Sequence, residues 1–525
     1  MFQMPDMSEW FNLGDYMLDR HIREGRGNKT AIYYRDQVIT YGELQKAANK
    51  VGNALLQAGV EEENRVMICL PDCPEFLYVY FGAMRIGAIP VPISTMALPQ
   101  DYKYFLNDGR GKALVTNSDL APNFVQIADE LRYLRHFIVV GDAGPGQRNF
   151  YDFIKDASDS LEVAKTSKDD MAFWLYSSGT TGQPKGVVHM HHDVLHFMPS
   201  YNENVLHITE DDIIYSASKM YFSYGRNTME AVFMTGAASL LMPELPKPEV
   251  IVETISRYKP TIYFSVPTSY MGVLDLLDKM DKEGAKYDLS SLRMCISAGE
   301  ALPKVIFDRW KDKFGVEILD GIGSTDVGGI YISSVPGKIK SGSCGVLLPG
   351  FNVKLTDDAG NPVPDGEIGV LWMNNDGSTP FYWRKHDKTK EAIVGEWFNT
   401  GDQFVKDSDG FYWFSGRADD MLKAGGIWVS PVEVENTILE HPAVLECGVV
   451  GFTDDTKLEK PLAFVVLREG FEGSPELEDE IKQHVRSRIS SYKCPRWIRF
   501  AKEFPRTATG KMQRYKLRAL LQEEN

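Results

Sequence analysis

Residues 176–186, with the sequence YSSGTTGQPKG, have the composition of a phosphate-binding loop. Small residues let the backbone approach an anion closely, hydroxyl and N–H groups donate to phosphate oxygens, and Lys185 supplies a mobile positive charge. The spacing differs from the GxxxxGK[ST] loop, because Gly186 follows the lysine. The alternative interpretation is a flexible surface loop. The segment predicts a site for a polyphosphate ligand.

The elements that must position this loop are short apolar runs alternating with helical patterns. Thr40 and Glu43 have capping-box spacing and begin a predicted helix that Gly59 ends. A second helix is predicted over residues 74–85. Strands are predicted at residues 66–70, 113–116, 137–140 and 172–176, the last directly before the loop. This alternation predicts an α/β fold with parallel sheets covered by helices on both faces.

The second half of the chain has a different pattern of predicted elements. Glycine and proline become frequent between residues 336 and 369, which predicts a β-rich subdomain. After about Asp419, the pattern predicts a helix at 431–440, strands at 443–451 and 462–467, and a helix at 477–489. We expect a large N-terminal part, residues 1–418, with two parallel-type α/β sheets plus the β-rich subdomain, and a small α+β C-terminal domain, residues 419–525.

The composition excludes several classes of protein. A net charge of −16 argues against non-specific binding of nucleic acid. Six scattered cysteines without a CxxC pair predict free thiols in a reducing compartment. No apolar run is long enough to cross a bilayer, and the N-terminus lacks the pattern of a secretory signal. We therefore expect a cytoplasmic protein without membrane or nucleic-acid partners.

Five motifs, in this order, resemble those of the acyl-adenylate-forming (AMP-binding) superfamily. They are YSSGTTGQPKG at 176–186, SAGEALP at 297–303, DGIGSTD at 320–326, TGD at 400–402 with GRADDMLKAGGIWVSP at 416–431, and PRTATGKMQR at 505–514. The chain is most similar to benzoate–CoA and other aryl acid–CoA ligases, through DGIGST, MLKAGGIWVSPVEVE, HPAVLE and YKCPRWIRF. The resemblance spans nearly the whole chain.

The resemblance implies ATP, Mg²⁺ and CoA as ligands, a carboxylic acid as the small-molecule substrate, and a homodimer as a possible assembly. Attack of a carboxylate on the α-phosphate of ATP joins two anions, so catalysis is mainly charge neutralisation and alignment. The residues expected to hold the phosphates are Ser177, Ser178, Gly179, Thr180, Thr181, Gly182 and Lys185. Those expected around the adenine and ribose are Gly299, Glu300, Ala301, Asp320, Gly321, Ile322, Thr325, Asp402 and Arg417.

The C-terminal motifs imply a domain that moves between two half-reactions. Lys511 is expected to reach the carboxylate and the α-phosphate in the first step. Asp419 stands at the family's hinge, and Gly426 is expected beside the pantetheine channel, where the absence of a side chain lets the thiol pass. Without the resemblance, Lys511 would read as a solvated lysine, and Asp419 as half of a solvated Asp–Asp pair.

The expected acid pocket shows the main departures from the family pattern. Its residues are Phe222, Ser223, Tyr224, Arg226, Gly323, Gly329 and Ile330. Gly329 stands where benzoate ligases tend to have histidine, and with polar residues at Ser223 and Arg226 this predicts a roomier or more polar pocket than benzoate needs. Arg226 is interpreted either as a substrate contact or as part of a structural ion pair with Asp326 or Glu230. Asp326 replaces the usual glutamate as the expected metal ligand and keeps its charge on a shorter side chain.

Other interpretations remain open at this point. The acid could be alicyclic, heteroaromatic or medium-chain, and the acceptor could be a carrier protein instead of CoA. A luciferase-like oxidase shares the first half-reaction. A multi-modular role is disfavoured, because the sequence contains no GxxS-bearing carrier domain or condensation domain. A nucleotide-binding regulator would require loss of Lys511 or of the phosphate loop. The group His189, His191 and His192 is interpreted as a polar helix start and not as a metal site.

Overall fold

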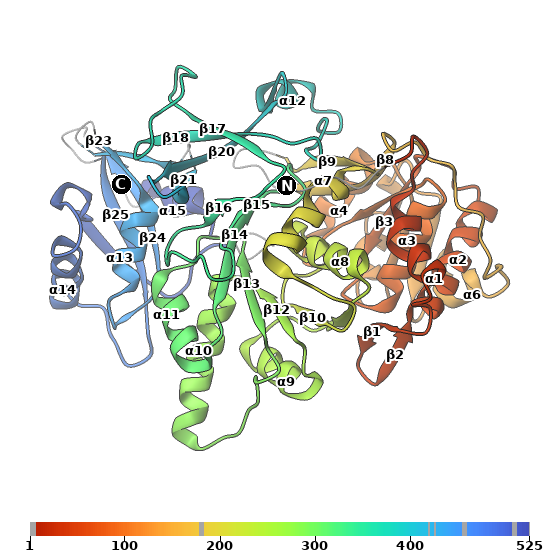
Figure 1. Cartoon of the computed structure of the whole chain (residues 1–525), viewed down its shortest axis with the longest axis horizontal. Coiled ribbons are helices and arrows are strands. Elements are labelled where there is room, and N and C mark those ends of the chain that lie inside the picture. Colours follow the sequence, from red (N-terminus) through yellow and green to blue (C-terminus); the bar gives the residue numbers. More distant parts are fainter. Residues whose placement is uncertain are drawn as a thin grey trace.

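The structure, a computed structural model, describes residues 7–177, 183–417, 420–424, 427–453, 459–506 and 512–523. In Figure 1 the N-terminal elements (red and orange) lie on the right, the middle of the chain (yellow and green) in the centre, and the C-terminal elements (blue) on the left. The prediction of an α/β fold with a smaller C-terminal unit is confirmed.

A five-stranded parallel sheet lies at the right of Figure 1. Its strands, in spatial order, are β4 (Ile89–Pro92), β3 (Arg65–Cys69), β5 (Gly111–Asn117), β6 (His136–Val140) and β7 (Arg148–Asn149). The predicted strands at 66–70, 113–116 and 137–140 all belong to this sheet, and their parallel pairing is confirmed.

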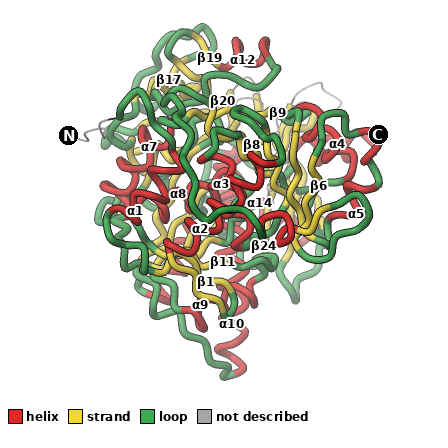
Figure 2. Tube along the Cα trace, turned by 90° about the vertical axis from the view of Figure 1, so that its right-hand side faces the viewer, coloured by secondary structure: helices red, strands yellow, loops and turns green. Residues whose placement is uncertain are grey.

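Helices cover both faces of this sheet, because successive side chains of a strand point to opposite sides. Val66 and Ile68 of β3 share a core with α2 (Tyr41–Gln57) and α3 (Pro74–Arg85). Met67 and Cys69 instead pack with α4 (Pro99–Asp108) and α5 (Ala121–Val125). Figure 2 shows α4 and α5 on one side of β6, with α2 and α3 on the other.

The two helices predicted in this region are confirmed. Helix α2 begins after Thr40, whose hydroxyl accepts from the Glu43 backbone N–H while the Glu43 carboxylate accepts from the Thr40 N–H at 2.8 Å. This is the predicted capping box, and Gly59 follows the helix with φ +78°. Helix α3 has the predicted bounds.

Within the described ranges, a 14-stranded sheet runs through the centre of the molecule. Its first strands are β2 (Gln37–Thr40), β1 (Thr30–Tyr34), β11 (Ala238–Leu241), β10 (Ile213–Ser216), β12 (Ile262–Ser265), β13 (Met294–Ala298) and β14 (Ile318–Gly323). It continues with β15 (Ile330–Ser333), β16 (Gly345–Leu347), β21 (Phe411–Arg417), β20 (Trp397–Lys406), β18 (Ile368–Asn374) and β17 (Asn352–Thr356), and β19 (Ile393–Val394) pairs with β20. Pairing is parallel from β1 to β14 and antiparallel beyond β14.

The β-rich region predicted after residue 336 is therefore not a sheet of its own. Strands β15 and β16 join it to β14 by backbone hydrogen bonds, so the parallel and antiparallel parts form one continuous surface. The sequence could not show this, because the pairing partner of a strand lies far away along the chain.

Both faces of the parallel part carry helices. Tyr263 and Cys295 face α9 (Pro248–Tyr258), α10 (Pro267–Glu283) and α11 (Lys304–Phe314). Phe264 and Ile296 face the core that includes α7 (Asp193–Tyr201) and α8 (Ser223–Thr235). Shorter helical segments are η1 (Asp15–Asp19), α1 (Arg20–Arg23), η2 (Ala128–Glu130), α6 (Phe150–Ile154), η3 (Asn202–Leu206), α12 (His386–Ala392) and η5 (Ser491–Lys493).

The strand predicted at 172–176 is present as β8 (Met171–Ser177), but the expectation that it joins a parallel sheet is wrong. It pairs antiparallel with β9 (Lys185–Met190) in a separate two-stranded sheet. The physical reason is the shortness of the phosphate loop, since parallel strands need a crossover of about a dozen residues or more.

The C-terminal elements form a compact α+β unit at the left of Figure 1. Strand β25 (Glu459–Leu467) pairs antiparallel with β24 (Val444–Thr453) and parallel with β26 (Trp497–Ala501). Helices α13 (Pro431–Leu439) and α14 (Pro475–Arg486) pack on one face, and α15 (Arg514–Glu523) on the other. A small hairpin, β22 (Leu422–Ala424) and β23 (Ile427–Val429), precedes them. The predicted elements after residue 430 are thus confirmed.

Two further expectations can be compared with the structure. All six cysteines are buried and free, as predicted. In the part of the chain that the structure describes, no helix has the length and apolar character that a membrane span requires.

Candidate active site

The phosphate-loop segment connects β8 and β9, so its two ends face each other across an antiparallel pair. Ser177 is the register partner of Lys185. The Ser177 hydroxyl is buried and has no hydrogen-bond partner among the described residues, which is unusual for a buried polar atom. A bound phosphate oxygen would satisfy it. The predicted loop residues Ser178, Gly179, Thr180, Thr181 and Gly182 lie outside the described residues.

Lys185 meets the expected metal ligand directly. Its Nζ lies 2.8 Å from Asp326 Oδ1 and 3.7 Å from the centroid of the Tyr382 ring. Asp326 belongs to the loop between β14 and β15, far from Lys185 in the sequence. Burial and the Asp326 carboxylate raise the pKa of Tyr382, so its phenol stays protonated as a donor. The structure thus joins two predicted residues and adds Tyr382, which the sequence analysis missed.

The donor chemistry at Asp326 suits Mg²⁺. A partly buried carboxylate beside the phosphate loop is the protein ligand that Mg²⁺ uses together with phosphate oxygens. Across the described residues, no three His, Cys, Asp or Glu side chains gather into a metal site of their own. A metal here would therefore depend on the phosphates of a nucleotide for most of its coordination.

The residues expected around the adenine lie at the carboxyl ends of two neighbouring parallel strands. Ala298 at the end of β13 pairs with Gly321 of β14, so Gly299, Glu300 and Ala301 emerge beside Asp320, Gly321 and Ile322. Ligands of open α/β sheets bind at such an edge. Gly299 has φ +92°, a conformation that glycine adopts without strain.

Asp320 has a buried carboxyl group among the residues expected around the adenine. Burial raises its pKa to about 8 from an ordinary value near 4, so it holds a proton at neutral pH. Its Oδ2 accepts from the Leu302 N–H at 3.4 Å, and no described residue pairs with its Oδ1. The site therefore contains an unfilled polar position of the kind that a base amino group could occupy.

Asp402 and Arg417 are register partners on β20 and β21. Arg417 Nη1 lies 2.8 Å from Asp402 Oδ1 and also donates to the Thr400 carbonyl at 3.3 Å. Asp402 is buried, whereas the Arg417 side chain is 43% exposed. The structure thus places these two predicted residues side by side, with the carboxylate fixed by a cation.

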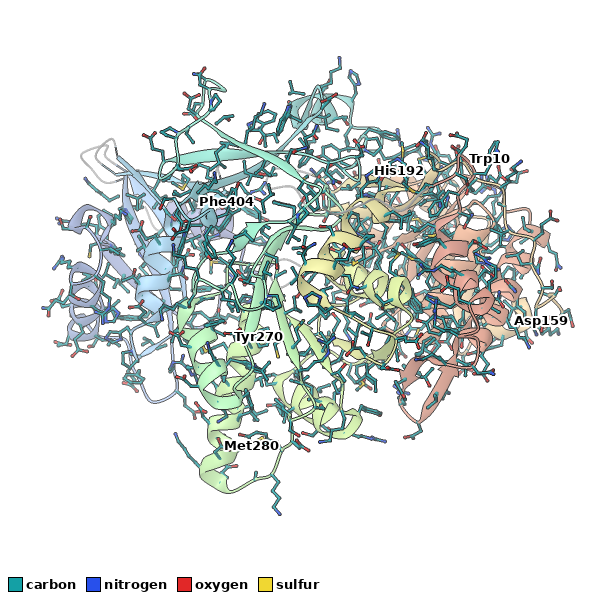
Figure 3. All side chains as sticks on the ribbon, in the orientation of Figure 1. Trp10, Asp159, His192, Tyr270, Met280 and Phe404 are labelled. Carbon is teal, nitrogen blue, oxygen red and sulfur yellow. The ribbon has the colours of Figure 1, made fainter. Side chains whose placement is uncertain are left out.

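The start of α8 carries three of the predicted acid-pocket residues. Phe222 is the N-cap residue, and Ser223 and Tyr224 form the first turn. The Tyr224 hydroxyl donates to the Ile296 carbonyl at 3.1 Å, as does the hydroxyl of Tyr270, labelled in Figure 3, at 2.9 Å. Both phenols are therefore anchored on β13 below the adenine wall.

Arg226 is completely buried and forms an ion pair with Glu230. Its Nη2 also donates to the Gly328 carbonyl at 2.6 Å. Of the two interpretations of Arg226, the structure shows the structural ion pair, with Glu230 and not with Asp326. Because it is buried in this ion pair, the guanidinium cannot contact a substrate in this arrangement.

The space expected beside Gly329 is filled. A Cβ built on Gly329 would lie 2.3 Å from Cδ2 of Phe197, a residue of α7. Gly323 is equally tight, with the Gly329 carbonyl 2.4 Å from its ideal Cβ, and Ile330 is buried at the start of β15. In the direction of a Cβ, Gly329 therefore leaves no extra space, because the Phe197 ring occupies the volume that a side chain would need. The roomier or more polar acid pocket stays a prediction.

The three histidines do not form a metal site. His189 lies between Asp193 Oδ2 and the Thr325 carbonyl, each at 2.8 Å, so Thr325 contributes its backbone to this contact. His191 accepts from the Leu13 N–H, and burial lowers its pKa to about 3. His192, labelled in Figure 3, is the N-cap residue of α7. The interpretation as a polar helix start is correct for His192 alone.

The remaining predicted residues, Lys511, Asp419 and Gly426, lie outside the described residues. The chain beside them is held within the C-terminal unit. Arg514 pairs with Glu435 at 2.7 Å, and Arg518 pairs with Asp420 at 2.6 Å.

Phe197, His189 and Tyr382 are the site residues that sequence reasoning missed or placed elsewhere. A phenylalanine within an apolar helical pattern is typical of any core, so no signal separated Phe197 from its neighbours. Tyr382 lies in a segment rich in aromatic residues, FYWRK, without motif spacing.

Comparison with known proteins agrees with this geometry. The chain matches the AMP-binding enzyme family over residues 18–383 and the AMP-binding enzyme C-terminal domain over residues 433–511. It is 39% identical to a benzoate–CoA ligase of Thauera aromatica over 514 residues, which cover 97% of this chain and 96% of the relative.

Two solved structures extend the similarity to the fold. The anthranilate CoA ligase AuaEII in complex with anthranoyl-AMP matches with a TM-score of 0.94 and 40% identity, over 99% of both chains. A benzoate CoA ligase from Burkholderia xenovorans LB400 matches with a TM-score of 0.88 and 37% identity, over 97% of this chain and 100% of that one. On these matches, the chain belongs to the AMP-binding enzyme family.

Proposed function

We propose that this chain is an ATP-dependent ligase that activates an aromatic carboxylic acid and transfers it to CoA. In the first step a carboxylate oxygen attacks the α-phosphorus of ATP, the bond to pyrophosphate breaks, and acyl-AMP forms. In the second step the CoA sulfur attacks the acyl carbon, AMP leaves, and the thiol proton is released. The products are the acyl-CoA thioester, AMP and pyrophosphate.

The observation that carries the proposal is the loop formed by residues 324–329. At one end Asp326 pairs with the phosphate-loop lysine, Lys185. At the other end Gly328 accepts from Arg226 of α8, the helix that begins with Phe222 and Tyr224. A single short loop therefore connects the proposed triphosphate site with the proposed acid site, as a reaction between a carboxylate and an α-phosphate requires.

The proposed roles follow from the charges at each position. Lys185, Ser177 and the loop residues 178–182 neutralise the β- and γ-phosphates, and Asp326 holds Mg²⁺, which screens the negative charge when bound. Asp402 accepts from the ribose hydroxyls with Arg417 in support, and the residues 299–301 and 320–322 enclose the adenine. Phe222, Tyr224 and Ile330 surround the ring of the acid with flat apolar surface.

We also propose a boundary between residues 418 and 419, with the C-terminal domain moving between the half-reactions. The support is that residues 422–521 have hydrophobic cores of their own. Lys511 then serves the first step, Asp419 acts as the hinge, and Gly426 lines the path of the CoA thiol. An aromatic acid is favoured over the alicyclic, heteroaromatic and medium-chain alternatives by the similarity to benzoate and anthranilate ligases.

The test is acid-dependent release of pyrophosphate from ATP, measured with and without CoA. The panel contains benzoate, 2-aminobenzoate, 3- and 4-hydroxybenzoate, cyclohexanecarboxylate, hexanoate and acetate. We expect the benzoates to have the highest kcat/KM and to require CoA for AMP release at full rate. Faster turnover of hexanoate or acetate would replace the aromatic assignment with another acid.

The cellular location and the oligomeric state complete the proposal. The buried free thiols support a cytoplasmic enzyme. We propose a homodimer, which light scattering after gel filtration tests directly.

A further inference from the structure

The Phe173 ring on β8 contacts two buried polar side chains, those of His189 and Arg226. The Phe173 ring stacks on His189, its register partner on β9, with centroids 5.1 Å apart and an interplanar angle of 22°. The guanidinium carbon of Arg226 lies 4.5 Å from the centroid of the same ring. The side chains of His189 and Arg226 are both completely buried. This stack connects the hairpin that carries the phosphate loop with the helix that begins the acid pocket.

Both of these side chains hold the backbone of the loop 324–329. His189 Nε2 lies 2.8 Å from the Thr325 carbonyl, and Arg226 Nη2 lies 2.6 Å from the Gly328 carbonyl. The other ring nitrogen of His189, Nδ1, lies 2.8 Å from Asp193 Oδ2, so both ring nitrogens have a polar partner. Two buried side chains therefore contact the loop at two carbonyls that are three residues apart.

The charge of Arg226 is neutralised by an ion pair inside the protein. Glu230 neutralises the guanidinium, and Asn227 completes the group by donating to Glu230 Oε2 at 3.0 Å and to the Gly328 carbonyl at 2.6 Å. Because the guanidinium is not exposed, it cannot meet a substituent of the acid. In the proposed function, the first turn of α8 and the loop 324–329 form two sides of the acid pocket. The hydrogen bonds from Arg226 and Asn227 to the Gly328 carbonyl join these two sides.

On the basis of that proposed function, we propose that Arg226, neutralised by Glu230, is a positioning residue that sets the width of the acid pocket. It does so by holding helix α8 on the Gly328 carbonyl, so that the two walls keep a fixed separation. Because Arg226 is paired with Glu230, it offers no cation to a second anionic group on the ring, so the pocket favours aromatic acids that have one carboxylate.

The test replaces the pair together, because removing one partner of a buried ion pair leaves an uncompensated charge. In the double variant Arg226→Leu/Glu230→Leu, we expect kcat/KM for 4-substituted benzoates to rise about tenfold relative to benzoate, the lower end of what one methylene group is worth in a pocket. Adding Asn227→Ala removes the second donor to Gly328 and should widen the ratio further. Arg226→Lys keeps the charge and should keep the wild-type ratio more closely than the double variant.

A matched control is the pair Arg85–Asp19. Arg85 is also buried, donates to Asp19 Oδ1 at 2.7 Å and bonds with Asn49, but it lies between η1, α2 and α3 and touches neither wall of the pocket. Arg85→Leu/Asp19→Leu should change thermal stability without changing the ratios between acids. This comparison separates positioning from a general loss of stability.

The outcomes are distinguishable. If wild-type protein adenylates neither benzoate nor any substituted benzoate, the proposed function fails. If it does, but the Arg226 and Glu230 variants keep the wild-type ratios, or change them no more than the Arg85 control, the positioning role is refuted. Turnover of benzene-1,4-dicarboxylate by wild-type protein as efficiently as 4-methylbenzoate would refute the exclusion of a second anion.

Discussion

Replacing Gly329 with alanine tests the close contact between this glycine and the ring of Phe197. The new Cβ would lie 2.3 Å from Cδ2 and 2.7 Å from Cγ of Phe197. Carbon atoms in contact prefer about 3.5 Å, so the ring or the loop must move by about 1.2 Å. Phe197 is only 1% exposed and cannot swing into solvent. Overpacking of this kind costs about 1–3 kcal/mol.

The assay is a double-mutant cycle of unfolding free energies from denaturant titration. We expect Gly329→Ala to destabilise the wild-type background by about 1–3 kcal/mol. In the Phe197→Ala background the methyl group enters the cavity left by the ring, so the same change should cost less by at least about 1 kcal/mol. The KM for benzoate should rise in Gly329→Ala and fall back in the double variant. Additive free energies would refute the contact between residue 329 and Phe197.

Four further outcomes are expected. Lys511→Ala should slow acyl-adenylate formation about 10²–10³-fold while thioester formation from supplied acyl-AMP is largely kept, and equal losses in both half-reactions would contradict domain movement. Asp419→Pro fixes φ near −65° and should impair CoA transfer more than adenylation, whereas unchanged turnover would make Asp419 an ordinary surface residue. Asp326→Asn should raise the Mg²⁺ concentration needed for half-maximal adenylation, and an unchanged Mg²⁺ titration would exclude it as the ligand. Burial raises the pKa of Asp320 to about 8, so its stabilising contribution is complete below about pH 4 and is lost as the pH rises through 8. Asp320→Asn should therefore lose less unfolding free energy than wild type between pH 5 and pH 8.5, and parallel pH profiles would show that the carboxyl ionises normally.

Local contacts explain the parts of the fold that could be predicted from the sequence. The capping box of α2 joins Thr40 and Glu43, three residues apart, so its spacing is visible in the sequence and the helix begins where expected. The strands of the five-stranded sheet are apolar runs bounded by turns, and their alternation with helices predicts parallel pairing. The same reasoning failed for β8, because strand type is a local property and the pairing partner is not.

The candidate site divides in the same way. Motif order identified Lys185, Asp326, Asp402 and Arg417 individually, since each stands in a segment whose composition suits an anion or a sugar. Their pairing, such as Lys185 with Asp326, depends on how two distant loops meet at one edge of the molecule.

By itself, therefore, the sequence determined the elements with local signals, the class of fold and the charged residues that we propose to lie near the phosphates. The tertiary structure decided what each side chain faces. Arg226 had two interpretations until burial and Glu230 excluded the substrate, and the room beside Gly329 disappeared once Phe197 of α7 was in place. The physical reason is that close packing lets each buried volume be filled only once, and the residue that fills it comes from whichever face of a distant helix the fold turns inward.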